Sequence, residues 1–154
     1  MEVNKDIQKS ILRYPGGKSK ALKFILEHIP NETTHLAAPF FGGGSVELAC
    51  ASMGIKVSGY DIFKPLVVFW QCVLEDKMKL ANMVKTYRPL SKERFYELQK
   101  QVEFKDKWEQ AAVFFVLNRS SFSGSTLSGG MSPNHPRFNE GSIERLENFE
   151  INNL

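Results

Sequence analysis

Apolar and polar positions in the first 60 residues follow first a helical and then an extended spacing. Apolar side chains recur at helical intervals over residues 21–26, and Pro30 follows them, which predicts a helix that stops before the proline. The short apolar run 34–38 predicts a buried strand, and the alternating run 55–60 predicts a second strand. Residues 45–51, between them, have the pattern of the first turns of an amphipathic helix. Together these elements predict a small α/β arrangement.

Helical spacing dominates the rest of the chain. Residues 65–73 are apolar on almost all sides, which predicts a buried helix, and a charged helical stretch follows over residues 76–87. Ser91 is placed to cap a further helix. Residues 108–118 carry aromatic side chains at helical intervals, which we interpret as core rather than as a base-stacking surface, and residues 139–149 predict a short last helix. The block from about residue 76 onward contains no convincing strand, so it is predicted to be an all-helical insertion into the α/β layout.

A long segment without a clear pattern joins the last two predicted helices. Residues 119–138 are rich in serine and glycine, yet Phe122, Leu127 and Met131 recur within them. Structureless stretches longer than about fifteen residues are uncommon in compact domains unless they are functional or disordered. Small hydrogen-bonding side chains with apolar wedges suit a loop that follows a phosphate backbone and reads base edges. The alternative is a flexible linker, although linkers seldom carry such apolar residues.

A glycine-rich turn lies between the first predicted strand and the helix that follows it. The turn is Pro39-Phe40-Phe41-Gly42-Gly43-Gly44-Ser45, and the second strand ends at Asp61. This order of strand, glycine turn, helix, strand and acid is the layout that binds an adenosine-type cofactor at the carboxyl edge of a parallel sheet. Glu47 stands where a dinucleotide fingerprint needs its third glycine, which argues against NAD. Phe40-Phe41 suits packing against an adenine or a methionine chain, and the alternative is a plain glycine-rich turn.

A second glycine motif comes earlier in the chain. Gly17-Lys18-Ser19 looks like the end of a phosphate-binding P-loop, but Leu12 stands where that motif needs its first glycine, so a P-loop is excluded. Basic residues are nevertheless frequent over residues 7–23. Such clustering suits a nearby carboxylate or phosphate, and a solvated basic face is the alternative.

Composition narrows the class of protein further. The 154 residues suit one domain, and 42% hydrophobic and 24% charged residues indicate a globular chain. A net charge of +3 is compatible with nucleic acid without requiring it. Cys50 and Cys72 form no metal-binding spacing, so we predict neither a disulfide framework nor a metal site. The absence of a signal peptide and of an apolar run long enough to span a bilayer predicts no membrane association and a cytoplasmic location.

Four motifs occur in an order that resembles the Dam-like DNA adenine-N6 methyltransferases. They are Tyr14-Pro15-Gly16-Gly17-Lys18, the glycine turn 39–45, Asp61 and Asn118-Arg119-Ser120-Ser121-Phe122-Ser123-Gly124. Each motif alone is weak. The four in this order extend over essentially the whole chain, and together they carry the resemblance.

The resemblance implies S-adenosylmethionine as the cofactor and double-stranded DNA, with a flipped adenine, as the partner. The implied cofactor-binding residues are Tyr14, Gly16, Gly17, Lys18, Pro39, Phe40, Phe41, Gly42, Gly43, Gly44, Ser45, Asp61 and Ile62. The implied DNA-binding residues are Arg13, Asn118, Arg119, Ser121, Phe122, Ser123, Gly124, Ser125 and Arg137. Lys18 would lie near the cofactor carboxylate and Asp61 would hold the ribose. Asn118 and Arg119, at the root of the loop, are either structural or base-reading.

Two departures from the family pattern bear on activity. Ala38 stands where the family usually has a glutamate, and the catalytic motif Asp-Pro-Pro-Tyr does not occur, so no catalytic residue is assigned. Two strands and the start of a third are predicted, whereas a doubly wound sheet has about five or more. We therefore hypothesise the amino-terminal part of a methyltransferase: a fragment, one half of a split enzyme or a truncated remnant. An unfinished sheet exposes strand edges, so a second chain or self-association is expected to complete it.

The sequence thus predicts a partial Rossmann-like methyltransferase fold in three parts. Residues 1–75 form the cofactor-binding α/β part, residues 76–149 a helical target-recognition insertion with the loop 119–138, and residues 150–154 the start of a return strand. The predicted function is site-specific DNA methylation, the transfer of a methyl group from S-adenosylmethionine to adenine N6, with this chain alone inactive. One alternative is a non-catalytic DNA-binding module. The other is a Rossmann-type enzyme with Asp61 on an NAD ribose.

Overall fold

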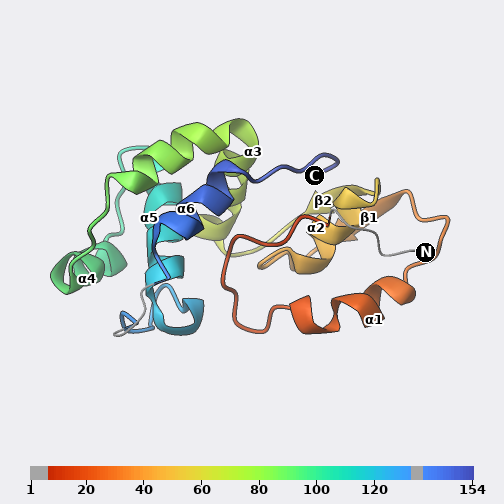
Figure 1. Cartoon of the computed structure of the whole chain (residues 1–154), viewed down its shortest axis with the longest axis horizontal. Helices are drawn as coiled ribbons and strands as arrows, with labels where there is room; N and C mark the ends of the chain where they lie inside the picture. The colour runs from red at the N-terminus through yellow and green to blue at the C-terminus, as the bar shows by residue number, and fades with distance from the viewer. Residues whose placement is uncertain (1–6, 133–136) are drawn as a thin grey trace. The chain divides into compact units, whose positions relative to one another are not determined.

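The computed structural model describes residues 7–132 and 137–154, which form a mixed α/β structure (Figure 1). Two short parallel strands and six α-helices make up its regular structure within these ranges. The mixed α/β class predicted from the sequence is therefore confirmed. The chain divides into two compact units. The first contains residues 16–62 and 150–154 with the amino-terminal residues up to Ser10, and the second contains residues 11–15 and 63–149.

The first unit is built around the two-stranded sheet. Its elements are the 3-10 helix η1 (Ser19–Ala21), α1 (Leu22–Glu27), β1 (His35–Ala38), α2 (Ser45–Ser52) and β2 (Lys56–Gly59). The strands pair in parallel, from His35 opposite Lys56 to Ala38 opposite Gly59. Leu26, Cys50 and Val57 belong to the buried apolar cluster that joins α1, α2 and the sheet. Both predicted helices and both predicted strands of this region are thus confirmed.

The exposure of β1 differs from the prediction of a buried strand. His35 and Ala37 are exposed, Leu36 is half-buried and Ala38 is buried. In the part of the chain that the structure describes, β1 pairs with β2 alone. Strand burial on both faces requires neighbouring elements on both faces, which a two-stranded sheet with few covering helices does not supply.

Residues 150–154 lie beside the outer edge of β2 without forming a strand. The Val57 N–H donates a hydrogen bond of 2.6 Å to the carbonyl oxygen of Asn153, and the Asn153 side-chain amide donates to the Ala51 carbonyl at 3.1 Å. Ile151 and Leu154 pack against the apolar cluster of the first unit. The expected start of a return strand is therefore represented by one backbone hydrogen bond and two anchoring side chains.

The second unit is helical. Its elements are α3 (Lys64–Lys85), α4 (Lys92–Lys100), α5 (Lys107–Ser120), the 3-10 helix η2 (Phe122–Gly124) and α6 (Glu140–Glu147). Helix α3 packs against α5 and α6, and α4 packs against α5 (Figure 1). Residues 111–120 of α5 are all buried, and the fully buried rings of Phe69 and Phe115 stack with centroids 5.7 Å apart. The aromatic stripe of residues 108–118, predicted to lie in the core, is confirmed as part of the core.

Local side-chain chemistry explains where these helices begin. Asp76 has non-helical backbone angles within α3, and its carboxylate accepts a hydrogen bond of 2.9 Å from the Lys79 N–H, so it caps the second half of the helix. The sequence pattern placed the change from apolar to charged helix at this residue. Ser91 caps α4 as predicted, and Asp106 caps α5. The compact units divide at residues 62/63, whereas the predicted functional parts divide at 75/76, because α3 lies wholly within the second unit.

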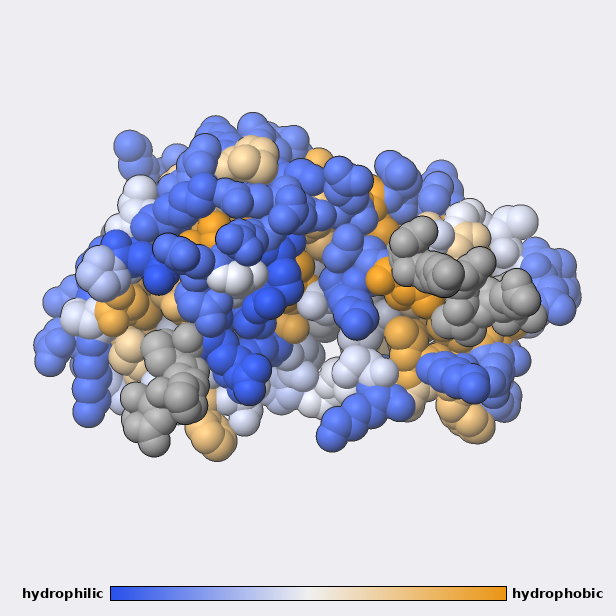
Figure 2. Space-filling model, in the orientation of Figure 1, coloured by the Kyte–Doolittle hydropathy of each residue, from blue (hydrophilic) through white to orange (hydrophobic). Residues whose placement is uncertain are grey.

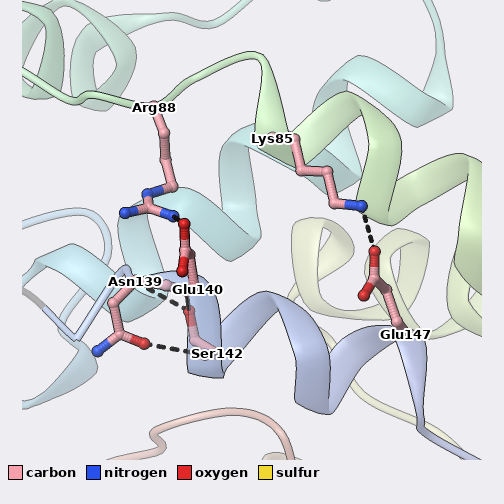
Figure 3. Close-up of polar contacts among 6 residues, drawn as sticks. All are labelled: Lys85, Arg88, Asn139, Glu140, Ser142 and Glu147. Atoms are coloured by element: carbon pink, nitrogen blue, oxygen red, sulfur yellow. Dashed lines mark hydrogen bonds and ion pairs between the residues drawn. The ribbon is translucent and has the colours of Figure 1, made fainter.

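Helix α6 is tied to α3 by polar contacts (Figure 3). Lys85 pairs with Glu147, and Arg88 lies 3.7 Å from Glu140. At the start of α6, Asn139 and Ser142 exchange hydrogen bonds in a capping box.

Hydrophilic residues cover most of the face drawn in Figure 2, and apolar residues show as smaller separate areas. Among the described residues, no helix has both the length and the apolar character needed to cross a bilayer.

Candidate functional site

Backbone hydrogen bonds within the glycine turn and to the residue after β2 hold the turn in place. The Phe41 N–H donates to the Tyr60 carbonyl and the Gly44 N–H donates to the Phe41 carbonyl, both at 2.9 Å. Gly42 and Gly44 have φ values of +53° and +73°, in the region that favours glycine. A methyl group on Gly44 would lie 2.6 Å from Cε1 of Phe41, and one on Gly59 would lie 2.3 Å from Cδ2 of the same ring. These glycines therefore make room for the Phe41 ring.

The two phenylalanines of the turn have different surroundings. Phe41 is buried between Gly44 and Gly59, so it supports the turn from inside. Phe40 is 87% exposed. Of the pair predicted to pack on a cofactor, only Phe40 is open to a ligand in this unit.

Asp61 is positioned by the same turn. The Gly42 N–H donates a hydrogen bond of 2.9 Å to Oδ2 of Asp61, which fixes the carboxylate at the carboxyl end of β2. Ile62, next in the chain, is 99% exposed, and Tyr60 is also exposed. The structure thus brings a fixed carboxylate, a turn with glycine amides and exposed apolar side chains to one edge of the sheet.

Glu47 occupies the first turn of α2, directly after the glycine turn. It is half-buried, and burial raises the pKa of its carboxyl group above the ordinary value. Burial, followed by the charge of Glu47, also raises the pKa of the Cys50 thiol. The helix therefore begins with an acid that is partly removed from water.

The first predicted motif is divided between the two units. Gly16, Gly17 and Lys18 form an exposed turn of the first unit, in which the Lys18 ammonium donates to the Gly16 carbonyl oxygen at 2.5 Å. Tyr14 and Pro15 belong to the second unit. The position of Tyr14 and Pro15 follows from that of Arg13, the residue before them in the chain.

In the second unit, Asn118 holds the backbone of Arg13. The Arg13 N–H donates to Oδ1 of Asn118 at 2.9 Å, and Nδ2 of Asn118 donates to the Arg13 carbonyl oxygen at 2.6 Å. Asn118 is 1% exposed. A methyl group on Gly124 would lie 2.3 Å from the same carbonyl oxygen. Asn118 thus fits the structural alternative that the sequence left open for the root of the loop, and Gly124 lies against the backbone that Asn118 holds.

The predicted structureless loop is instead ordered by hydrogen bonds. Arg119 and Ser120 belong to α5, and Ser121 and Met131 form an antiparallel bridge, which closes the segment 121–131 into a compact loop. Nε2 of Gln99 donates to two carbonyl oxygens of this loop, those of Thr126 at 3.1 Å and Gly129 at 2.7 Å. Residues 133–136 of the predicted loop lie outside the described residues. The prediction of a structureless stretch was wrong because serine and glycine composition does not reveal these hydrogen bonds, two of which come from Gln99, more than 20 residues earlier.

Apolar and small polar side chains cover the outside of loop 121–131. Phe122 is 66% exposed, and Leu127 and Ser123 are exposed, while Ser125 is half-buried. The buried hydroxyl of Ser121 has no hydrogen-bond partner among the described residues. The loop therefore presents two apolar side chains on a rigid base.

A cavity of about 360 Å³ opens between this loop and the amino-terminal segment of the second unit. Its lining includes Tyr14, Asn118, Ser125 and the rings of Phe63 and Phe114, whose centroids lie 6.0 Å apart. A lining of aromatic and polar side chains is typical of small-molecule sites of this size. Phe63 and Phe114 were missed by the sequence argument, because a helical aromatic pattern does not distinguish a cavity wall from a core residue.

The charges of three arginines of the second unit act on a fourth, Arg119. Arg119 is 7% exposed, and its Nε donates to the Arg137 carbonyl oxygen at 3.2 Å. Burial, followed by the charges of Arg145, Arg13 and Arg137, lowers the pKa of Arg119 to about 10. Nη1 of Arg13 donates to the Ser121 carbonyl at 3.2 Å. Arg145 was not predicted as a site residue, because nothing in the sequence relates α6 to the end of α5.

The sequence matches the family model of the D12 class N6 adenine-specific DNA methyltransferases over residues 14–134. No curated protein matches it. The match covers more than half of the chain, so the protein belongs to this family, and the resemblance noted in the sequence is confirmed.

Proposed function

We propose that this D12-class chain binds S-adenosylmethionine and DNA for transfer of a methyl group to the N6 nitrogen of adenine. The observation that carries the proposal is the fixed pair of the glycine turn and Asp61 at one sheet edge, in a chain of this family. In this proposal the two strands are part of a Rossmann-like sheet. The first unit supplies the cofactor site, and the second unit supplies target recognition.

The residues at the sheet edge fit the chemistry of the cofactor. A carboxylate oxygen accepts more than one hydrogen bond, so Asp61 can bind ribose hydroxyls while it keeps the Gly42 N–H. Phe40 and Ile62 offer exposed apolar surface for the adenine and the methionine chain. The other proposed cofactor residues of this unit are Gly16, Gly17, Lys18 and the remainder of the turn 39–45, whereas Tyr14, predicted with them from the sequence, belongs to the second unit. When bound, the cofactor supplies an electrophilic methyl group.

The transfer itself requires no covalent intermediate on the protein. The exocyclic nitrogen of adenine attacks the methyl group directly, and what an enzyme contributes is alignment and removal of a proton. The motif Asp-Pro-Pro-Tyr, which would hold that nitrogen, does not occur in this sequence. We therefore propose that the chain binds both reactants and does not catalyse the transfer alone. A second chain that carries this motif and pairs with the sheet is the proposed source of the remaining groups, whereas self-association would complete the sheet alone.

The second unit would contact DNA through loop 121–131 and the arginines at its base. Phe122, Ser123 and Ser125 are available on the loop, and Arg13, Arg119 and Arg137 supply positive charge. Phosphate contacts fix the register of a protein on the duplex, while groups at the loop tip read bases. Asn118, Ser121 and Gly124 are proposed to act by holding the loop.

Calorimetric titration with S-adenosylhomocysteine tests the cofactor site. We expect binding to the wild-type chain, loss of binding in Asp61→Ala, and unchanged binding in Glu32→Ala, which removes an exposed acid of the same unit. Equal affinities of both variants would show that Asp61 does not hold the ribose. If the wild-type chain is folded and does not bind S-adenosylhomocysteine, the result favours the non-catalytic DNA-binding module described next.

The alternative function is a non-catalytic DNA-binding module. It is favoured by the position of the ordered loop and the arginines, all within the second unit, which does not contain the glycine turn. This alternative predicts DNA binding that S-adenosylhomocysteine and Asp61→Ala leave unchanged.

A further inference from the structure

Four arginines in the second unit form a cluster without a carboxylate counter-charge. They come from four separate places: Arg13 from the amino-terminal segment, Arg119 from the end of α5, Arg137 from the segment before α6, and Arg145 from α6. Within residues 7–132 and 137–154, none of them forms an ion pair. Holding like charges together costs free energy, because each raises the electrostatic energy of the others.

Arg119 is at the centre of this arginine cluster. Its side chain is almost fully buried, whereas buried charges are normally paired. Within the same described ranges, only its Nε has a protein hydrogen-bond acceptor, the Arg137 carbonyl. The two Nη groups are thus left to bind something else. A guanidinium with both Nη groups available matches two oxygens of an anion in a bidentate geometry.

The neighbours of Arg119 are held in place by groups that leave their charges uncompensated. Asn118 fixes the backbone of Arg13, and Nη1 of Arg13 donates to a neutral carbonyl, that of Ser121. The Arg137 carbonyl is fixed by Arg119 itself. Arg13 and Arg119 are thus positioned in advance, which lowers the ordering cost of binding an anion.

The glutamates of α6 do not neutralise the cluster. Glu140 and Glu147 pair with Arg88 and Lys85 on the side that faces α3 (Figure 3). Glu144 lines the same depression between α3 and α6. Strongly hydrophilic residues gather beside α6 on the face drawn in Figure 2. The acids of the helix are therefore directed to the contact with α3, while the positive charge of Arg145 acts on Arg119 and lowers its pKa.

We propose that Arg13, Arg119, Arg137 and Arg145 bind one phosphate group of a nucleic-acid backbone. The proposal rests on the proposed function, which assigns DNA to this unit, and it adds a defined phosphate position and a residue from α6. Two non-bridging oxygens of a phosphodiester match the Nη groups of Arg119, and the other three arginines surround the charge. Arg119 thereby acts in phosphate binding rather than in base reading.

The first test compares inorganic phosphate with chloride at equal ionic strength, by thermal unfolding. The test variant is Arg137→Gln/Arg145→Gln, and the control is Lys92→Gln/Arg94→Gln, which removes the same charge from the exposed face of α4. Without phosphate, the test variant is expected to unfold at the wild-type temperature or above it, because like charges are removed. Phosphate should raise the midpoint of the wild type and the control more than that of the test variant. Equal phosphate responses in the two variants would overturn the site.

The second test measures binding of a short DNA duplex over a series of salt concentrations. Loss of one phosphate contact is expected to reduce the slope of log affinity against log salt by about one in the test variant, with the control unchanged. A phosphate response without this change of slope would identify a site for free anions and overturn the assignment to nucleic acid. Failure of the proposed function gives a different result, absence of S-adenosylhomocysteine binding, which neither variant affects.

Discussion

Asn118 binds both polar groups of the Arg13 backbone, across 105 residues of sequence. The two hydrogen bonds, of 2.9 and 2.6 Å, join the end of α5 to the short segment that precedes the first glycine motif. Because Asn118 is buried, water cannot easily replace either bond.

Removal of this side chain should therefore destabilise the second unit. Asn118→Ala leaves a donor and an acceptor in the backbone of the half-buried Arg13 without these partners, for which we expect a loss of about 1–3 kcal/mol in the free energy of unfolding. Urea denaturation measures the loss. Asn82→Ala, an exposed asparagine of α3, is the control and should change stability by less than about 0.5 kcal/mol. Similar values for the two variants would mean that the segment 11–15 is held by other contacts.

The glycine turn offers a test that separates backbone strain from steric conflict. Gly44 and Gly54 both have positive φ, of +73° and +88°, but only Gly44 would place a methyl group against another side chain, that of Phe41. We expect Gly54→Ala to cost about 1–2 kcal/mol, the strain of the left-handed conformation. Gly44→Ala should cost more and should also weaken S-adenosylhomocysteine binding. Equal effects in denaturation would show that the Phe41 ring moves aside.

The exposed ring of Phe122 should matter for DNA and not for stability. Phe122→Ala is expected to leave the unfolding midpoint unchanged, because the ring is 66% exposed, and to weaken duplex binding measured by fluorescence anisotropy. Phe24→Ala is a matched control, since Phe24 is 65% exposed in the first unit. If both variants bind DNA as the wild type does, the loop does not use this ring as a wedge.

The partly buried Glu47 predicts a pH dependence of stability. Burial raises the pKa of its carboxyl group in the folded state, so the folded chain binds more protons than the unfolded chain above the ordinary value of 4.5. Stability therefore falls as the pH rises through the window between that value and the raised pKa. Glu47→Gln should increase stability at neutral pH and flatten this dependence. Thermal unfolding at about pH 4, 5, 6 and 7 measures both effects, and an unchanged profile would mean that Glu47 is effectively solvated.

Local signals in the sequence predicted the first unit well. A run of glycines, strand alternation and an acid after the second strand are signals carried by residues that are close in sequence. They predict that the turn 39–45 and Asp61 lie together, in agreement with the hydrogen bond from Gly42 to Asp61. The different roles of Phe40 and Phe41 could not, because they depend on the space over Gly59. Two phenylalanines in one turn give the same signal in the sequence, but their burial depends on which distant residues pack against each ring.

Contacts over long sequence distances account for what was missed in the second unit. The loop 121–131 looked structureless because Gln99, which binds two of its carbonyls, lies more than 20 residues earlier. Arg145 was missed for the same reason, since its relation to Arg119 exists only after α6 has packed against α3. Serine and glycine composition indicates flexibility only where no distant side chain satisfies the backbone.

The bond between Arg13 and Asn118 also has a consequence for biosynthesis. Ile11 and Leu12 are buried, and they directly precede Arg13 in the sequence. They leave the ribosome about a hundred residues before Asn118, which anchors their segment. Until α5 has been released, the two hydrogen bonds that join this segment to Asn118 cannot form. The second unit combines residues 11–15 with residues 63–149, so it can complete its folding only after α5 and α6 have been synthesised.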